Sequence, residues 1–201
     1  MIAAITGANG FIGQHLVRRF AEAGWETRPV VRRDFEAGKL EALFGGVDVV
    51  VHAAGETRAP TAMLLRASNV GLTRQVIEAA RRGKAGRLVF ISSQAAAGPA
   101  PSRETPTTES SPPTPREEYG RSKLEAERLV EAAVDLDPVI LRPAAVYGPG
   151  DRDFLTMFRL ARFGIALHPG NRDQWISIVH VDDVARAVVA AAADRRSAGR
   201  R

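Results

Sequence analysis

The amino-acid sequence predicts an α/β protein with a doubly wound parallel sheet that is covered by helices on both faces. Short apolar runs alternate along the chain with longer amphipathic stretches, which is typical of strand–helix–strand units. The stretch VDVVVHAAG at 47–55 is apolar on both faces, as expected for a strand buried between two helical layers. A glycine-rich segment follows the first apolar run and precedes the first helical stretch.

The expected elements alternate through the first 150 residues. Strands are expected at Ile2–Ile5, Thr27–Val31, Val47–Val51, Leu88–Ile91 and Val139–Leu141. Helices are expected at Gly10–Ala23, Glu36–Phe44, Leu64–Arg82 and Glu117–Val134, the last with apolar residues at helical spacing. The proline-rich segment Gly98–Pro115 cannot form a helix or a central strand, so a surface loop or lid is expected there.

The pattern changes after residue 150. We expect a helix at Phe154–Phe163, a short strand at Trp175–Val179 and a final helix that ends near Ala193. Asp182 or Asp183 is a plausible N-cap of that helix. The sequence therefore predicts a nucleotide-binding domain at 1–150 and part of a substrate-side lobe at 151–201.

Three glycines in the first turn predict a dinucleotide site of the Rossmann type. Gly7, Gly10 and Gly13 form a GxxGxxG pattern between the first strand and the first helix. Such glycines permit a tight turn, allow backbone amides to approach a pyrophosphate and let the helix pack closely on the strand. The helix N-terminus adds free N–H groups and partial positive charge. A purely structural turn is the alternative.

The residues after the second strand bear on the choice of cofactor. An NAD site usually has a carboxylate there, whereas Arg32 and Arg33 follow this strand. Guanidinium groups suit a 2′-phosphate because they combine a fixed charge with bidentate donors. The sequence therefore favours NADP, with NAD as the alternative. Asp34 is a rival carboxylate, and two surface arginines without a ligand are the plain alternative.

A tyrosine and a lysine at helical spacing predict proton-transfer chemistry. Tyr119 and Lys123 are four residues apart and share one face of the expected helix. A nearby ammonium lowers the pKa of a phenol, so the pair can exchange a proton with an alcohol or a ketone. Ser92 and Ser93 end the strand Leu88–Ile91, where parallel sheets bind ligands, and either hydroxyl could bond a substrate carbonyl.

These motifs together resemble the extended short-chain dehydrogenase/reductase family, the NAD(P)-dependent epimerase/dehydratase-like group. The resemblance rests on TGANGFIG at 6–13, HAAG at 52–55, ISSQAAAGP at 91–99, YGRSK at 119–123, RPAAVYGPGDR at 142–152 and SIVHVDDVARAV at 177–188. It implies that Tyr119 is the general acid/base, that Lys123 lowers its pKa and bonds the nicotinamide ribose, and that Ser93 orients the substrate oxygen.

The resemblance and the two arginines together define an expected cofactor site. Its residues are Gly7, Asn9, Gly10, Phe11, Ile12, Gly13, Arg32, Arg33, Ala53, Ala54, Gly55, Asn69, Tyr119, Lys123, Pro143 and Val146. Two departures from the family pattern are expected. Residues 32–46 have room for one short helix only, so the edge third strand is expected to be absent and the sheet to have about six strands. The C-terminal substrate lobe is expected to be incomplete.

The expected reaction is hydride transfer at a hydroxyl or keto carbon of a small-molecule substrate, by an oxidoreductase or an epimerase. Gln94 and Ala95 replace the Asp-Glu that follows the catalytic Thr of the family's sugar dehydratases, and Arg32 replaces an acidic residue, which favours a reductase. A non-catalytic NAD(P)-binding sensor or assembly protein, or a truncated remnant of the enzyme, is the alternative. The family often forms homodimers through the YxxxK helix and its predecessor.

Composition excludes several other classes. The chain has no cysteine, which excludes a disulfide scaffold and a thiol nucleophile and makes a cytoplasmic location the default. No apolar run reaches the length of a membrane span. The net charge of +5 comes from scattered arginines, so no nucleic-acid partner is expected. No metal is expected at His180, Asp182 and Asp183, because further ligands are not recognisable.

Overall fold

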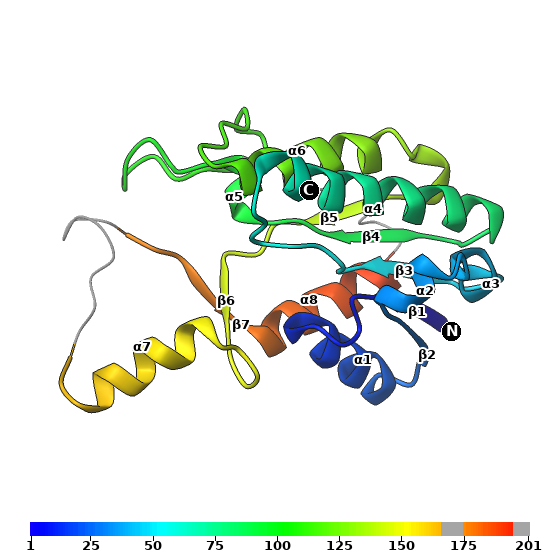
Figure 1. The fold of residues 1–201 in the computed structure, drawn as a ribbon, viewed down its shortest axis with the longest axis horizontal. Helices are drawn as coiled ribbons and strands as arrows, with labels where there is room; N and C mark the ends of the chain where they lie inside the picture. The colour runs from blue at the N-terminus through cyan, green and yellow to red at the C-terminus, as the bar shows by residue number, and fades with distance from the viewer. Residues whose placement is uncertain (166–174, 195–201) are drawn as a thin grey trace.

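The computed structural model describes residues 1–165 and 175–194, which form a parallel sheet between two helical layers (Figure 1). The sheet has five strands in the order β2-β1-β3-β4-β5. They are β1 (Ile2–Thr6), β2 (Glu26–Val30), β3 (Val49–His52), β4 (Leu88–Ile91) and β5 (Val139–Leu141). A second sheet pairs β6 (Ala145–Tyr147) with β7 (Ile178–His180), also in parallel. The predicted fold class is confirmed.

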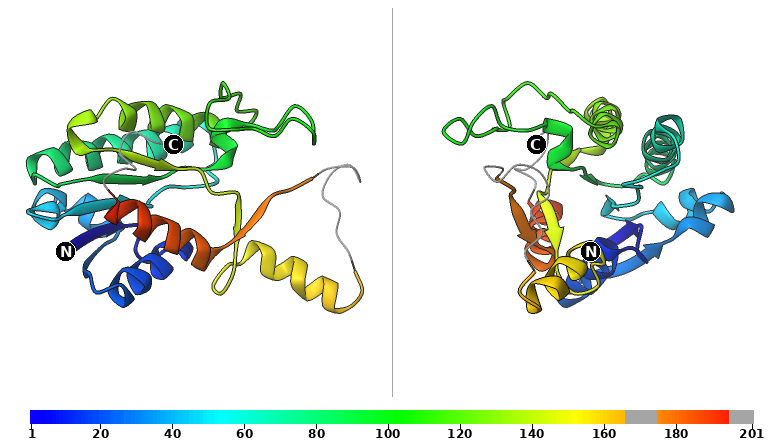
Figure 2. Two further views of the ribbon diagram at one scale, coloured as in Figure 1. Left: turned by 180° about the vertical axis from the view of Figure 1, so that it is seen from behind. Right: turned by 60° about the vertical axis from the view of Figure 1, so that its left-hand side comes forward.

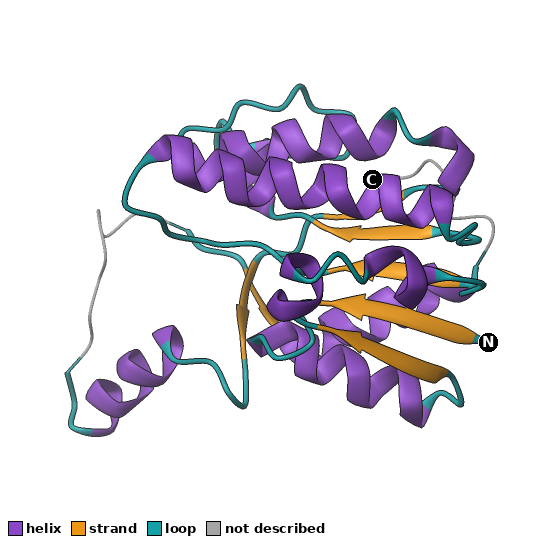
Figure 3. Cartoon of the chain, turned by 45° about the vertical axis from the view of Figure 1, so that its right-hand side comes forward, coloured by secondary structure: helices purple, strands orange, loops and turns teal. Residues whose placement is uncertain are grey.

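Helices cover both faces of the main sheet (Figure 3). One face carries α1 (Phe11–Glu22) and α8 (Val181–Ala193). The other carries α3 (Leu40–Phe44), α4 (Ala62–Arg82) and α6 (Glu118–Glu131). The remaining helices are α2 (Arg32–Glu36), α5 (Gln94–Ala97), α7 (Asp153–Arg162) and a 3-10 turn at Val134–Leu136. Among the described residues, no helix is long and apolar enough to cross a membrane.

Alternation along the strands divides the core into two layers. In β3, Val50 packs toward α3, α4 and α6, whereas Val49 and Val51 pack toward α1 and α8. In β4, Phe90 and Val89 divide in the same way. Because successive strand residues point to opposite faces, a sheet covered on both sides needs apolar residues at every position. That need explains why the strands appear in the sequence as continuous apolar runs.

The prediction of about six strands is wrong, because the main sheet has five. The strand expected at Trp175–Val179 forms as Ile178–His180 and pairs with β6 instead of extending the main sheet. The predicted absence of an edge third strand is confirmed, since residues 32–46 contain only α2, α3 and turns.

The single helix expected at Glu36–Phe44 is also wrong, because two short helices occupy this region. Gly38, between them, has φ +64°, a left-handed conformation that interrupts a helix and favours glycine. The carboxylate of Asp34 accepts the N–H of Val31 at 2.8 Å and so caps the first of the two helices. The rival cofactor carboxylate therefore has a structural partner.

The C-terminal elements differ from the core in how they pack. The helix α7 has no buried residue and projects away from the main sheet (Figure 2). The helix α8, in contrast, buries Val184, Ala185 and Val188 beside α1.

The predicted division at residue 150 stays a prediction. The expected loop at Gly98–Pro115 is confirmed, because no helix or strand forms there. Residues 166–174 and 195–201 of the predicted lobe lie outside the described residues.

Candidate active site

The glycine-rich turn lies at the carboxyl end of β1 and packs against the segment after β3. Gly7 has φ +69°, and a Cβ atom there would lie 2.9 Å from the nitrogen of Ala54. A Cβ on Gly13 would lie 2.0 Å from the carbonyl oxygen of Gly7, so the helix α1 can approach the turn only without a side chain. Two of the three glycines are therefore required by packing alone.

The start of α1 has the features of an anion site. Gly10 is its N-cap, and no side chain hydrogen-bonds to the first turn. The first N–H groups of a helix have no partner within the helix, and they carry partial positive charge. Asn9, Phe11 and Ile12 belong to this turn and first helical residues. A small, uncapped turn with exposed amides fits the pyrophosphate of a dinucleotide.

Ser93 and Tyr119 lie close together at the carboxyl end of β4, and Lys123 follows Tyr119 by one turn of α6. Both are partly exposed, whereas Lys123 is buried. The Lys123 ammonium donates to the carbonyl oxygen of Ile91 at 2.8 Å and lies 4.1 Å from the centre of the Phe90 ring. Ser93 and Tyr119 thus keep part of their surface exposed, while the ammonium of Lys123 is enclosed. The structure brings together the three residues that the sequence nominated.

Burial dominates the acid–base properties of these groups. It raises the pKa of Tyr119 above its ordinary value, against a smaller lowering by the hydrogen bond with Ser93. Burial also lowers the pKa of Lys123 to about 7, against an opposing effect of Glu127. Tyr119 is therefore protonated at neutral pH. Lys123 is not among the groups that shift the Tyr119 pKa, so its expected effect stays a prediction.

A glycine that the sequence reasoning did not nominate sets the position of Tyr119. A Cβ on Gly120 would lie 2.2 Å from the carbonyl oxygen of Ala95, in the helix α5. Ser93 is the N-cap of that same helix and accepts the N–H of Ala95 at 3.1 Å. The absence of a side chain next to Tyr119 therefore allows the two helices, and the two hydroxyls, to approach each other. The YGRSK motif offered this signal.

The five residues Thr6, His52, Asn69, Thr73 and Ser122 form a buried chain of uncharged hydrogen bonds, here called the neutral cluster. The Thr73 hydroxyl donates to the carbonyl of Asn69 at 2.7 Å, so it accepts from His52 Nε2 at 3.0 Å. His52 Nδ1 then accepts from the Thr6 hydroxyl at 2.9 Å. Burial, with a smaller effect of Lys123, lowers the pKa of His52 to about 3, so its imidazole stays neutral.

Asn69 connects the neutral cluster to the helix that carries Tyr119. Its amide donates to Ser122 Oγ at 2.9 Å, and Ser122 donates to the carbonyl of Tyr119 at 2.7 Å. Its side-chain oxygen accepts the N–H of Glu56 at 2.8 Å. A Cβ on Gly55 would lie 3.0 Å from that oxygen. The predicted residues Ala53, Ala54, Gly55 and Asn69 thus lie together, between the glycine-rich turn and the tyrosine helix.

The two arginines after β2 lie on the surface at the start of α2. Arg32 donates to Glu56 at 2.8 Å, and its side chain is 79% exposed. Glu56 directly follows the predicted cofactor segment 53–55, so the guanidinium lies beside that segment. Arg33 is exposed as well. The structure thus places Arg32 beside the segment expected to hold the adenosine.

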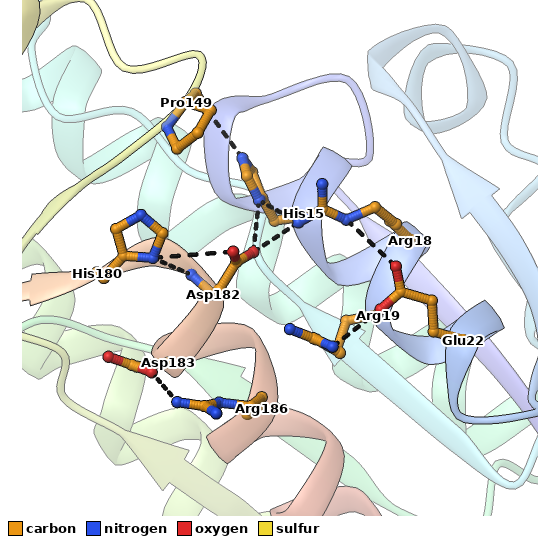
Figure 4. A network of polar contacts seen from close by, with 9 residues as sticks. All are labelled: His15, Arg18, Arg19, Glu22, Pro149, His180, Asp182, Asp183 and Arg186. Atoms are coloured by element: carbon orange, nitrogen blue, oxygen red, sulfur yellow. Dashed lines mark hydrogen bonds and ion pairs between the residues drawn. The ribbon is translucent and has the colours of Figure 1, made fainter.

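A polar network holds the segment between β5 and α7 against α1 (Figure 4). His15 donates to the carbonyl of Pro149 at 2.8 Å and contacts the Asp182 carboxylate at 3.1 Å. Arg18 binds the same carboxylate at 2.6 Å. Val146, in β6, packs against the apolar core between the sheet and the helices α1 and α8. Pro143, at the other end of this segment, accepts the N–H of Gln94 at 2.9 Å.

The acidic pair at the start of α8 has structural partners. His180, whose Nδ1 accepts the N–H of Asp182 at 3.2 Å, is the N-cap, so the expectation of an aspartate cap is wrong. Asp183 pairs with Arg186 on the next turn. Among the residues that the structure describes, no group of three His, Cys, Asp or Glu side chains could hold a metal ion.

The comparison with known families decides the identity of the chain at the family level. The model of the NAD dependent epimerase/dehydratase family matches residues 3–201. The chain belongs to this family. The family resemblance that the motifs predicted is therefore confirmed. The matched residues include the glycine-rich turn and the tyrosine helix.

Relatives of the epimerase/dehydratase family catalyse different reactions. The ceramide reductase of Caulobacter vibrioides is 35% identical over 207 residues, which cover 94% of this chain and 60% of that protein. The solved structure of MoeE5 with UDP-glucose and NAD is 29% identical, with TM-score 0.84, and the match covers 98% of this chain and 74% of that one. The solved structure of RMD from Pseudomonas aeruginosa with NADPH is 27% identical, with TM-score 0.83, and the match covers 99% of this chain and 76% of that one. This chain thus spans about three fifths of the reductase.

Ser92, Glu127 and Arg142 are here called the ionic cluster; Glu127 and Arg142 were not nominated from the sequence, and Ser92, the alternative to Ser93, is buried and bonded to Glu127. Glu127 is fully buried in α6, one turn after Lys123. Arg142 binds it with two hydrogen bonds, at 2.8 Å and 2.6 Å, and Ser92 donates to the same carboxylate. The available signal was the equal spacing of Tyr119, Lys123 and Glu127, which places a carboxylate on the inward face of the helix.

Proposed function

We propose that this chain is an NAD(P)-dependent oxidoreductase that reduces a keto group by hydride transfer, with Ser93, Tyr119 and Lys123 as its catalytic residues. The observation that supports this proposal is the proximity of two partly exposed residues, Ser93 and Tyr119, on elements that also hold the buried Lys123. Epimerisation of a hydroxyl group by the same residues is the second candidate, since the family name includes epimerases and a UDP-glucose 4-epimerase of Vibrio cholerae is 30% identical to this chain.

The proposed cofactor site extends from the glycine-rich turn to the end of β5. The amides at Asn9–Gly13 would hold the pyrophosphate, residues 53–55 and Asn69 the adenosine side, and Pro143 and Val146 the nicotinamide side. The bound nicotinamide supplies the hydride. NADP is preferred over NAD because Arg32 and Arg33 offer guanidinium groups where a 2′-phosphate would lie.

The raised pKa of Tyr119 suits reduction rather than oxidation. A phenol that stays protonated at neutral pH can donate its proton to the oxygen of a ketone as the carbon accepts a hydride. Ser93, hydrogen-bonded to that phenol, would orient the same oxygen. Lys123 would hold the ribose and stabilise the phenolate that remains after proton transfer.

We propose a weakly polar ketone, such as an acyl-chain or terpenoid ketone, as the substrate class. The 35% identity with ceramide reductase supports this choice. So do the exposed apolar side chains of α7 and of the segment before β7, which include Phe158, Phe163 and Trp175. The absence of an Asp-Glu pair after Ser93 argues against a sugar dehydratase.

The decisive experiment is the oxidation of NADPH with a panel of lipid ketones and nucleotide sugars. Tyr119→Phe should reduce turnover by roughly 10²–10⁴-fold, because the proton donor is lost. The chain has two tyrosines, so Tyr147→Phe is the matched control and should retain most activity. Tight NADPH binding without turnover on any substrate would instead support the non-catalytic sensor or remnant.

The cofactor preference has a separate test in thermal stability. A ligand that binds only the folded state stabilises it by mass action, so NADPH should raise the melting temperature more than NADH does. Arg32→Ala should remove this difference, and Lys39→Ala, on the same surface, should leave it unchanged. Equal shifts with both dinucleotides would refute the preference for NADP, and a larger shift with NADH would argue for NAD.

We also propose a homodimer formed by α4 and α6 against the same helices of a second copy. These helices pack on each other and expose Met63 and Leu64 at the start of α4. Sedimentation at micromolar concentration should show a dimer, and Leu64→Glu should convert it to a monomer. A wild-type chain that sediments as a monomer would refute this arrangement.

A further inference from the structure

Glu127 is a fully buried carboxylate whose oxygens are both occupied. Arg142 Nε lies 2.8 Å from one oxygen and Arg142 Nη2 lies 2.6 Å from the other. The Ser92 hydroxyl donates to the first of these oxygens. A bidentate contact of this kind is typical of an ionised carboxylate and a guanidinium.

The ionic cluster joins the two chain segments that carry the proposed catalytic residues to the segment that carries Pro143, a residue of the proposed cofactor site. Ser92 precedes Ser93 at the end of β4, and Arg142 precedes Pro143 at the end of β5. Glu127 lies on the helix of Tyr119 and Lys123, one turn beyond the lysine. Backbone hydrogen bonds connect the first two segments directly, from Ser92 to Leu141 at 2.7 Å and from Gln94 to Pro143 at 2.9 Å. A shift of the carboxylate would therefore disturb all three segments.

Stability alone does not account for this cluster. A buried ion pair is often no more stabilising than apolar residues of the same volume, because both charges lose their hydration. The pair is located beside a second buried charge, the ammonium of Lys123. The Glu127 carboxylate can compensate the buried positive charge of Lys123, and an apolar residue in its place could not.

The groups that face Lys123 come from four elements. Its own helix contributes Tyr119, which is protonated, and Glu127. The strand β4 contributes the Ile91 carbonyl and the Phe90 ring, β3 contributes the neutral His52, and Gly55 and Asn69 lie nearby. Arg142, from the end of β5, binds the carboxylate of Glu127. Among the described residues, Glu127 is the carboxylate that opposes the effect of burial on Lys123.

We propose that Glu127 is a positioning residue for the reaction: with Ser92 and Arg142 it holds together the two segments that carry the catalytic residues and the segment that carries Pro143, and its carboxylate, one turn beyond Lys123, compensates the charge of the buried ammonium. This role rests on the proposed function of Lys123 at the cofactor. Tyr119, Lys123 and Glu127 then share one inward face of α6. On this face Glu127 acts on Lys123, and Lys123 acts on Tyr119.

The test is the titration of Lys123 by NMR in the full chain, with lysine labelled with ¹³C at Cε. Only three lysines are present, and Lys39 and Lys84 are exposed, so their signals can be identified with Lys→Arg variants. In Glu127→Gln, which keeps the shape but removes the charge, the midpoint for Lys123 should fall by about one pH unit or more. Glu125→Gln, on the same helix with an exposed carboxylate, should leave it unchanged.

A second variant covers the case in which Arg142, left without its partner, prevents folding. Glu127→Gln combined with Arg142→Gln removes both charges and should show the same fall. An unchanged Lys123 midpoint in either folded variant would overturn the proposal. Where turnover is found, the alkaline limb of the kcat profile should move by the same amount. A wild-type chain without turnover would count against the proposed function only, since the titration is measured without cofactor.

Discussion

Two buried clusters surround the tyrosine helix, and they solve the same problem with opposite chemistry. The neutral cluster joins β1, β3 and α4 to α6 through hydroxyls, an amide and an uncharged imidazole. The ionic cluster joins β4 and β5 to α6 through a carboxylate and a guanidinium. Hydrogen-bonded neutral groups are buried at little cost, whereas buried charges are costly unless every partner is present. The comparison predicts that the two clusters respond differently to pH and to the loss of one member.

The largest expected effect belongs to Lys123, the charge between the clusters. Its pKa is lowered to about 7, so between pH 7 and 10.5 the folded chain binds fewer protons than the unfolded chain. The penalty for burying the ammonium is complete below pH 7 and is relieved as the pH rises through this window. Lys123→Met should be more stable than wild type below pH 7 by up to about 5 kcal/mol relative to their difference at pH 10.5.

Urea unfolding of both proteins across that pH range measures this effect. Lys84→Met, at an exposed site, is the control and should follow the wild-type curve. Parallel curves for Lys123→Met and wild type would show that the ammonium is not buried as described.

The next largest effect distinguishes a broken ion pair from a removed one. Arg142→Met leaves the Glu127 carboxylate buried without its partner and should cost about 3–5 kcal/mol in the free energy of unfolding. Glu127→Leu combined with Arg142→Met should return most of that loss, because no charge remains buried. Chemical denaturation of the three proteins provides the measurement, and equal losses in the single and double variants would contradict the ionic nature of the cluster.

The neutral cluster should show itself through acid sensitivity. Because the pKa of His52 is lowered to about 3, its contribution to stability is present above pH 6.5 and is lost as the pH falls toward 3. Between pH 6.5 and 5 this loss is about 2 kcal/mol. His52→Gln should lack this component, whereas His180→Gln, at a partly exposed histidine, should keep it. The same decline in His52→Gln would assign the acid sensitivity elsewhere.

The smallest effect is expected at an exposed ion pair between α4 and the tyrosine helix α6. Arg66 and Glu125 lie 2.6 Å apart, with more than a third of each side chain exposed. Glu125→Ala should change the free energy of unfolding by less than about 1 kcal/mol, because water screens the pair. Thermal unfolding at low and high salt measures it. A loss as large as that of Arg142→Met would mean that burial is not what separates the clusters.

Much of the fold was predictable because both faces of the sheet are covered. Continuous apolar runs identified the strands, and Leu88–Ile91 and Val139–Leu141 were located to the residue. The errors have local causes. Gly38 divides the helix expected at Glu36–Phe44, and β7 pairs with β6 rather than with the main sheet. Neither outcome follows from hydrophobic periodicity. The helix break depends on one backbone conformation, and the strand pairing depends on contact between distant segments.

The candidate site shows the same division. Motif spacing nominated Ser93, Tyr119 and Lys123, because residues four apart on a helix share a face and strand ends meet at one edge of a parallel sheet. The structure brings these residues together, and their roles remain proposals. Spacing could not reveal that His52 is a neutral bridge, or that Ser92 and Arg142 meet Glu127, because those contacts join residues 15 to 46 positions apart in the sequence.

By itself, the sequence determined the layered α/β fold, the family and the residues with the chemistry for proton transfer. These follow from local periodicity and from short motifs whose spacing along one strand or helix is already a distance in space. Only the tertiary structure decided which of those groups are buried, and therefore which are charged: the protonated Tyr119, the ammonium of Lys123 titrating near neutrality and the neutral His52. The physical reason is that a pKa depends on the water excluded and the partners supplied by every packed element, and those come from the whole chain.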